Sequence, residues 1–319
     1  MLSQALRRKA KRSPKGGSIE NGESSRSRND DGGHAGEIAF CDGSSNRLTY
    51  RDLLLSSVQV LGEGNLGMVQ KVVWMDGLTL AAKRLHPVAI SKGEFSKRVE
   101  KLATLKSEYL VPTRAYFYSK RTKLVLYDYY PMGSLADLLR GAKEHGHTPL
   151  DWQGRIRIAT QVARAISFIH RQNPSPDKDL QMNVHGSIKS TNIFLRIDFS
   201  ACLSNYGYLQ LVESIHVPPS QKCDVHSFGV VLMELLGGLG AVSKVNLVME
   251  RRDEIKTREV KFFDFAGGER EIEQACEVLR MALECLARSP EERPSMEQIL
   301  LVLEAMAFKC APIDCTNSH

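Results

Sequence analysis

Residues 224–238, DVHSFGVVLMELLGG, are the stretch that most restricts what this chain can fold into. The run is apolar on nearly every side of a helix and ends in two glycines, a pattern typical of a buried helix with a glycine C-cap. A helix of this kind needs other helices around it. Two candidates are RIRIATQVARAISFIH (155–170), with apolar residues at helical spacing, and PSMEQILLVLEAMAF (294–308), which begins with a Ser295 and Gln298 capping pair. The second half is therefore predicted to be helical.

The first half has a different pattern. The runs VQVLGEGNLGMVQKVVW (58–74), LTLAAKRL (78–85) and KLVLYDYY (123–130) are strand-like, and LTYRDLLLSS (48–57) predicts a short preceding helix. We therefore expect an α+β fold with a small β-rich N-lobe at 37–130 and a larger helical C-lobe at 131–308. Residues 1–36 and 309–319 are expected to be tails, the first because it has hardly any large apolar residue. The boundary between the lobes is a favourable place for a ligand.

Composition places the chain among ordinary globular proteins. No stretch approaches the roughly 20 consecutive apolar residues that span a bilayer, and the N-terminus MLSQALRRKAKRSPKGG lacks the apolar segment of a signal peptide. The seven cysteines form no C-x-x-C pair, which argues against a zinc site or a disulfide framework and fits a reducing compartment. We expect a cytoplasmic protein.

The net charge of +6 comes mainly from one cluster near the N-terminus. The cluster consists of Arg7, Arg8, Lys9, Lys11, Arg12 and Lys15. Two interpretations stay open, because a basic run of this kind is either a solvated arm or a contact for anionic lipid or nucleic acid.

GEGNLGMV places Gly62, Gly64, Gly67 and Val69 in G-x-G-x-x-G-x-V spacing. Glycines at these positions let backbone amides approach a phosphate where a β-carbon would obstruct it, although the motif alone is a weak signal. Sixteen residues after Gly67 comes Lys83, which lies on a predicted strand and could reach phosphate oxygens as a point charge.

The order of several motifs is more specific than any one of them. The glycine loop and the strand lysine are followed by VLYDYY, HGSIKSTN, NYG, CDVHSFG and RPSM, which is the order found in protein kinases. From about residue 37 to about residue 308 the chain resembles the kinase domain of plant leucine-rich-repeat receptor-like kinases. The segments most similar to that family are LTYRDLLLSSVQVLGEG, YDYYPMGSL, LDWQGRIRIA, KSTNIFL and DVHSFGVVLMELL.

The resemblance implies roles for individual residues. The implied nucleotide-binding residues are Gly62, Gly64, Gly67, Val69, Ala81, Lys83, Tyr127, Lys189 and Asn192. Tyr127 takes the gatekeeper position before a hinge at 128–130. His185 belongs to the catalytic loop, Asp224 is the buried carboxylate that braces that loop, and Arg293 is a structural arginine.

The departures from the family pattern fall at the positions that carry the chemistry. Arg98 stands where the third-helix Glu should pair with Lys83, and Glu100 is expected to point off the required face. Ser187 replaces the Asp that accepts the substrate proton, and Asn205 replaces the D-F-G Asp that holds magnesium. Only 18 residues separate Asn205 from Asp224, without an A-P-E motif, so Arg293 is expected to lack its usual glutamate partner.

The resemblance with these departures predicts a pseudokinase that acts as a signalling scaffold or switch, with an active receptor kinase among its expected partners. The alternative is a weakly active or unconventional Ser/Thr protein kinase. ATP binding without metal is one expectation, and retention of the glycine loop only as fold scaffolding is the other; Mg²⁺ binding is not expected. The basic tail resembles a juxtamembrane segment, so we expect contact with the anionic inner face of the plasma membrane and no specific nucleic acid.

Overall fold

The computed structural model describes residues 36–43, 48–74, 77–86, 90–144, 150–174, 180–212 and 219–310. These residues belong to one compact unit. The basic cluster at residues 7–15 and residues 311–319 lie outside the described ranges, so the expectation of two tails stays a prediction. The division into lobes at residues 130 and 131 also stays a prediction.

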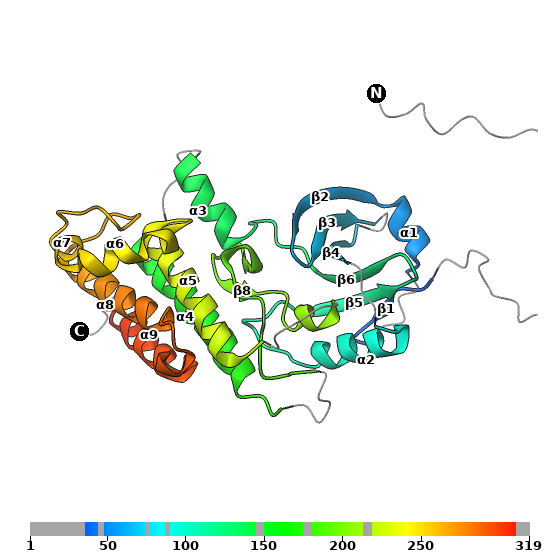
Figure 1. Ribbon diagram of the computed structural model, residues 1–319. Coiled ribbons are helices and arrows are strands. Elements are labelled where there is room, and N and C mark those ends of the chain that lie inside the picture. Colours follow the sequence, from blue (N-terminus) through cyan, green and yellow to red (C-terminus); the bar gives the residue numbers. More distant parts are fainter. Residues whose placement is uncertain are drawn as a thin grey trace, which may run out of the picture. The chain divides into compact units, whose positions relative to one another are not determined.

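The first half of the chain forms a six-stranded antiparallel sheet in the order β1-β5-β6-β4-β3-β2 (Figure 1). The strands are β1 (Ala39–Phe40), β2 (Ser57–Gly64), β3 (Gly67–Val73), β4 (Thr79–Leu85), β5 (Thr113–Tyr118) and β6 (Lys123–Asp128). Strands β3 and β4 lie inside the sheet, so the glycine turn between β2 and β3 is held beside the strand that carries Lys83.

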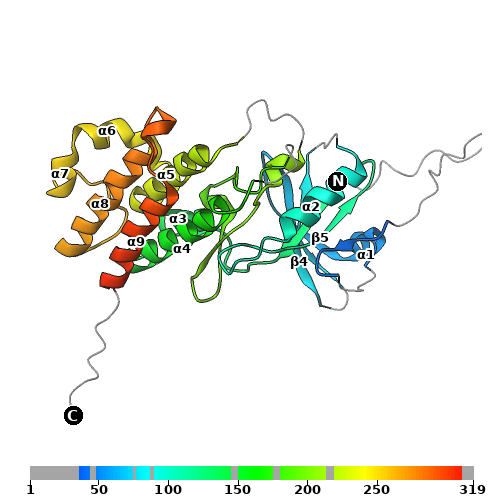
Figure 2. The ribbon, with the colours of Figure 1, turned by 90° about the horizontal axis from the view of Figure 1, so that it is seen from below.

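Two helices accompany the sheet (Figure 2). The short helix predicted after residue 48 is α1 (Tyr50–Leu55), and Thr49 and Asp52 form its capping box. Helix α2 (Lys92–Ala103) starts at the Ser91 N-cap and buries Phe95, Val99 and Leu102, which share one face because they are four and three residues apart. This face packs on β5, where Phe95 contacts the rings of Tyr116 and Tyr118.

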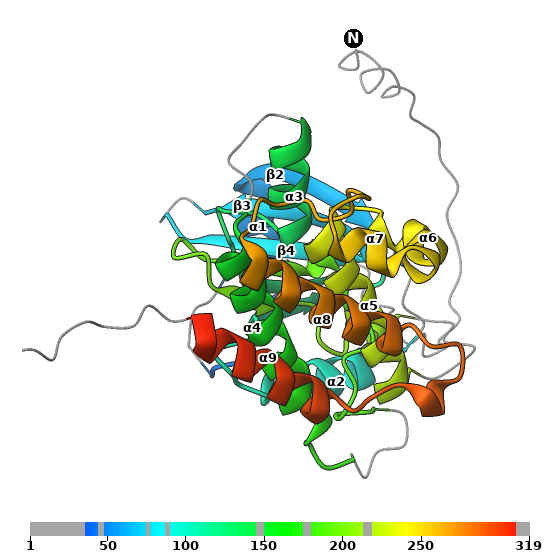
Figure 3. The same cartoon turned by 90° about the vertical axis from the view of Figure 1, so that its left-hand side faces the viewer.

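The second half is helical, as predicted, and Figure 3 shows its helices stacked beside one another. The helices are α3 (Leu135–Glu144), α4 (Trp152–His170), α5 (Gln221–Gly237), α6 (Val245–Glu250), α7 (Arg252–Lys256), α8 (Glu269–Cys285) and α9 (Met296–Cys310). Helix α5 is the buried helix expected from its composition, with α4 and α8 packed against it. It ends at the Gly238 C-cap, which has a positive φ of 79°, and Ser295 and Gln298 form the predicted capping pair before α9.

A small hairpin joins the two parts of the unit. Strands β7 (Ile193–Leu195) and β8 (Ala201–Leu203) form a two-stranded sheet, with the one-turn segment η1 (Ser190–Asn192) before it and η2 (Tyr208–Leu211) after it. Single β-bridges pair Leu203 with Leu110 and Phe194 with Ser134. The small sheet is thus bonded to the segment before β5 and to the segment before α3. The result is an α+β fold with an antiparallel β-sheet lobe and a helical lobe, which confirms the predicted class.

Within the described ranges, no single helix is long and apolar enough to cross a membrane. By length and composition alone, one bent pair, Gln221–Gly237 with Ala241–Glu250, meets that test together.

Candidate functional site

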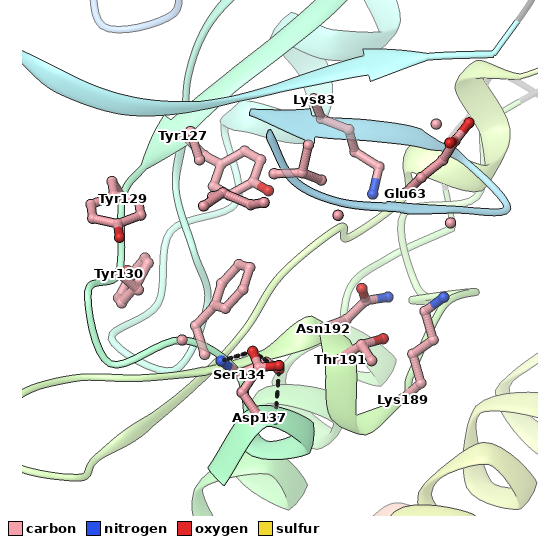
Figure 4. Close-up of a pocket in the computed structure, with 18 of the residues that line it drawn as sticks. Glu63, Lys83, Tyr127, Tyr129, Tyr130, Ser134, Asp137, Lys189, Thr191 and Asn192 are labelled. Carbon is pink, nitrogen blue, oxygen red and sulfur yellow. Dashed lines mark hydrogen bonds between the residues drawn. The ribbon is translucent and has the colours of Figure 1, made fainter. Parts of the chain in front are cut away.

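All nine residues predicted to bind nucleotide line one cavity of about 480 Å³ (Figure 4). Strands β2, β3, β4 and β6 supply one wall, and the segment around η1 supplies the other. The remaining lining residues are Leu61, Glu63, Asn65, Tyr129, Tyr130, Pro131, Gly133, Ser134, Asp137, Thr191 and Phe194. A volume of this size is within the range of small-molecule pockets.

The glycine turn closes the cavity at the end of β2 and β3, where Gly64 pairs with Gly67. Gly67 has φ 128°, and a β-carbon there would lie 1.9 Å from the carbonyl oxygen of Arg84, so only glycine fits. A β-carbon on Gly62 would meet nothing within 4 Å, and one on Gly64 would lie 3.9 Å from Lys189 Nζ. The turn therefore leaves its backbone open to the cavity and has a cation from the other lobe close by.

Lys83 points from β4 into the cavity, toward Asn192 and Lys189 (Figure 4). Its side chain is 6% exposed, and no carboxylate pairs with it among the residues that the structure describes. Burial, and then the nearby Lys189 cation, lowers the pKa of Lys83 to about 8. Lys83 is thus a cation without a counterion, which favours an anionic ligand.

Helix α2 does not supply the missing carboxylate. Arg98 Nε donates to Glu94 Oε1 at 2.6 Å, and Arg98 Nη1 donates to the carbonyl oxygen of Gln210 in η2 at 2.9 Å. Glu100 instead accepts a hydrogen bond from the hydroxyl of Tyr116 at 2.5 Å, on the β5 side of the helix. Among the described side chains, Glu100 therefore bonds to Tyr116 and forms no ion pair with Lys83.

The side chain of Leu102 packs closely on the backbone of Gly207, which holds α2 against the NYG segment (205–207). Gly207 has φ 69°, and a β-carbon there would lie 2.3 Å from Leu102 Cδ2. Together with the bond from Arg98 to Gln210, this contact fixes α2 to η2 through packing and one hydrogen bond.

Asp224 braces the loop that contains His185, as predicted. Its carboxylate accepts hydrogen bonds from the amides of His185 at 2.7 Å and Gly186 at 2.9 Å, and it also lies 3.1 Å from His170 Nε2. Burial lowers the pKa of His185 to about 4, so its imidazole is neutral at pH 7. His185 Nδ1 accepts a bond from the amide of Ser187 at 3.1 Å, which leaves it a scaffold residue.

Ser187 and Asn192 bond to each other. Asn192 Nδ2 donates to the carbonyl oxygen of Ser187 at 2.8 Å and to its hydroxyl at 3.0 Å. A hydroxyl in this place cannot accept a proton from a substrate alcohol as a carboxylate does, because a serine hydroxyl is far less basic. These bonds hold the described loop together, and a serine, not a carboxylate, stands at position 187.

The residues present do not fit a magnesium ion. Asn205 adopts φ 66°, and its Oδ1 is buried without a hydrogen-bond partner among the residues that the structure describes. This neutral amide oxygen is a weak donor for a hard cation, which prefers carboxylate oxygens. Asp137, a cavity carboxylate, already accepts hydrogen bonds from the amide and hydroxyl of Ser134 (Figure 4), and it also pairs with Arg140. The described residues contain no group of three His, Cys, Asp or Glu side chains that could hold a metal.

The sequence interpretation missed the aromatic wall of the cavity. Phe194 on β7 stacks on Tyr130 with ring centroids 5.5 Å apart and on Tyr127 at 6.0 Å. Its signal in the sequence is its place two residues after Asn192, and both residues line the cavity. A planar apolar ligand would fit against these rings.

The guanidinium group of Arg293 donates its hydrogen bonds to backbone carbonyl oxygens. Its guanidinium donates to the carbonyl oxygens of Ala287 at 3.0 Å and Lys222 at 2.9 Å. Among the described residues no ion pair to a carboxylate is formed by Arg293. The short segment before Asp224 is only partly described, because residues 213–218 fall outside the described ranges.

Comparison with known proteins identifies relatives over most of the chain. The family model described as protein kinase domain matches residues 55–217. An Arabidopsis thaliana protein named "Probable inactive receptor kinase At4g23740" is 34% identical over 307 residues, which cover 87% of this chain and 47% of that relative. The "Inactive leucine-rich repeat receptor-like serine/threonine-protein kinase At1g60630" of the same plant is 33% identical over 301 residues, covering 85% of this chain and 44% of the relative. The chain spans about half the length of these curated relatives.

Two solved structures share the fold. The pseudokinase domain of BIR2, an immune regulator of the RLK/Pelle family, has a TM-score of 0.73 at 26% identity, and the match covers 87% of this chain and 92% of that one. The maize SIRK1 kinase domain bound to AMP-PNP has a TM-score of 0.71 at 25% identity, over 85% of this chain and 100% of that one.

Proposed function

Because the chain belongs to the protein kinase domain family, we propose that it is a pseudokinase that binds an adenine nucleotide without transferring the γ-phosphate. The observation that carries this proposal is the composition of the cavity. Lys83 and Lys189 face it as cations, while the three positions that need a carboxylate hold Arg98, Ser187 and Asn205. Relatives named as inactive receptor kinases support the absence of transfer, and the AMP-PNP bound to the maize kinase supports a nucleotide in the cavity.

Binding would use the parts that remain. The backbone amides of the glycine turn and the two lysines would hold the phosphates, because amides and cations can neutralise an anion without a metal. The stacked rings of Tyr127, Tyr130 and Phe194 would contact the base. No described side chain is placed to take the proton from an attacking hydroxyl, so the bound nucleotide would stay intact.

A thermal-shift titration tests nucleotide binding. A ligand that binds only the folded protein at ten times its Kd adds about 1.4 kcal/mol to the free energy of unfolding. We expect ATP at pH 7 to raise the melting temperature equally with EDTA and with Mg²⁺, and Lys83→Ala to lose the shift. No shift at millimolar ATP would refute the proposal.

The same titration has a pH dependence set by Lys83. Because its pKa is lowered to about 8, the fraction of Lys83 that carries charge falls as the pH rises through 8. The Kd for ATP of the wild type should therefore rise by up to about tenfold between pH 7 and 9. Lys83→Arg keeps its charge over this range and should show a flat profile; parallel profiles for the two proteins would contradict the role of Lys83.

We further propose that the domain acts through signalling proteins, an active receptor kinase among them, at the inner face of the plasma membrane. The tail cations at residues 7–15 support the membrane contact. Binding to anionic vesicles that survives deletion of residues 1–15 would exclude the tail as its cause. The competing function is a weak Ser/Thr kinase, which the retained Lys83 and Asn192 alone would favour.

A further inference from the structure

A second hollow, of about 540 Å³, lies on the other face of the sheet from the nucleotide cavity. Lys83 faces the cavity, and its neighbour Arg84 faces the hollow, because successive residues of a strand point to opposite sides. The hollow is lined by Glu63, Met68, Arg84, Leu85, His86, Lys120, Arg121 and Lys123. The turn between β5 and β6 carries Lys120 and Arg121, and these two cations therefore lie beside the end of β4.

Most of the charged side chains that line this hollow are cations. Two arginines and two lysines line it against the single carboxylate of Glu63. Within the described part of the chain, none of these four cations forms an ion pair. Lys123 Nζ donates to the carbonyl oxygen of Lys120 at 3.1 Å and lies 4.8 Å from the ring centre of Tyr118, which holds it in place. Arg84, Lys120 and Arg121 are exposed.

We propose that this hollow binds a phosphorylated side chain in an extended segment of a partner protein. A phosphate carries close to two negative charges and three acceptor oxygens, and clustered arginines recognise it through charge-assisted hydrogen bonds. A flat lipid surface would touch the rim, whereas a single phosphate can enter a concavity and meet several cations at once. Met68, which is partly exposed, gives the flanking peptide an apolar contact.

The site is distinct from the nucleotide cavity, although the two share the glycine turn. Glu63 lines both, and His86 Nε2 lies 3.1 Å from the carbonyl oxygen of Gly64. Binding of a phosphopeptide needs neither Lys83 nor a nucleotide, so its test is run without nucleotide and its failure leaves the proposed nucleotide binding unaffected.

Fluorescence anisotropy with the full chain tests the proposal. The probe is a labelled Gly-Ala-Ala-pSer-Ala-Ala-Gly peptide, with its unphosphorylated form as the ligand control. We expect binding of the phosphorylated form only, weakened by salt because the contacts are charged and exposed. Arg84→Gln combined with Arg121→Gln should weaken binding about tenfold or more, since two charge-assisted contacts are lost.

The matched control removes two exposed charges elsewhere. Arg252→Gln with Lys261→Gln lowers the net charge equally from the helical lobe and should bind like the wild type. Equal binding of both peptide forms, no binding at millimolar peptide, or equal losses in the two double variants would each overturn the proposal. Vesicles of phosphatidylcholine with about one-fifth phosphatidylserine form the second arm. Loss of vesicle binding in the Arg84 and Arg121 variant, without peptide binding by the wild type, would assign the hollow to the membrane and reject the phosphopeptide.

Discussion

Replacing Asp224 with alanine is expected to lower the free energy of unfolding by about 3–5 kcal/mol. Asp224 is 1% exposed, and its carboxylate accepts hydrogen bonds from the amides of His185 and Gly186. Alanine would leave both amides without a partner inside the protein, and each unsatisfied buried donor costs about 1–3 kcal/mol. Chemical denaturation of the purified protein without nucleotide measures the change.

Asp137→Ala is the matched control for this substitution. Its carboxylate also accepts hydrogen bonds from the amide and the hydroxyl of Ser134, and a third from Arg140, but its side chain is 58% exposed. Water can replace the lost acceptor there, so we expect a loss of about 1 kcal/mol or less. Similar losses for Asp224→Ala and Asp137→Ala would mean that Asp224 does not brace the loop.

The second large effect is expected at Gly207. Gly207→Ala should cost about 3 kcal/mol, because the new β-carbon would lie 2.3 Å from Leu102 Cδ2 and because φ 69° strains any residue with a side chain. The readout is again the free energy of unfolding. Gly186→Ala shares the left-handed backbone at φ 80°, but its β-carbon would have its closest contact at 3.5 Å, with Pro219, so it should lose only about 1 kcal/mol of strain.

The difference between these two glycine variants reports the contact between α2 and the NYG segment. In a Leu102→Ala background, Gly207→Ala should lose less stability than in the wild type, because the colliding methyl groups are gone. Equal costs in both backgrounds would show that α2 is not packed on Gly207.

Local patterns were sufficient for much of the fold. The buried character of α5 follows from its apolar residues on nearly every side, and its end follows from the glycines at 237 and 238. The cap of α9 follows from two residues three positions apart. The nine cavity residues were predictable through a family resemblance, because motif order places them, and composition alone would not have brought Lys83 beside Lys189.

Contacts between distant segments could not be predicted. The sequence indicated that Glu100 points away from Lys83, but its bond to Tyr116 needs the position of β5. The resemblance indicated that Arg98 places a positive charge where the family has a glutamate. Its bond to Gln210 could not be predicted, because it depends on how the NYG segment turns. The basic hollow joins the end of β4 to the turn between β5 and β6, two segments about 36 residues apart, so no local pattern reveals it.

Incorporation of γ-phosphate by the purified chain tests the central claim most directly. Ordinary kinases turn over at about 1–100 per second, and loss of a general base alone costs about 10²–10⁴-fold. With either magnesium or manganese, and with the chain itself and a generic protein substrate as acceptors, we expect no incorporation above that of Lys83→Ala. Transfer that depends on Lys83 and proceeds at about one per second or faster would contradict the assignment of this chain as a pseudokinase.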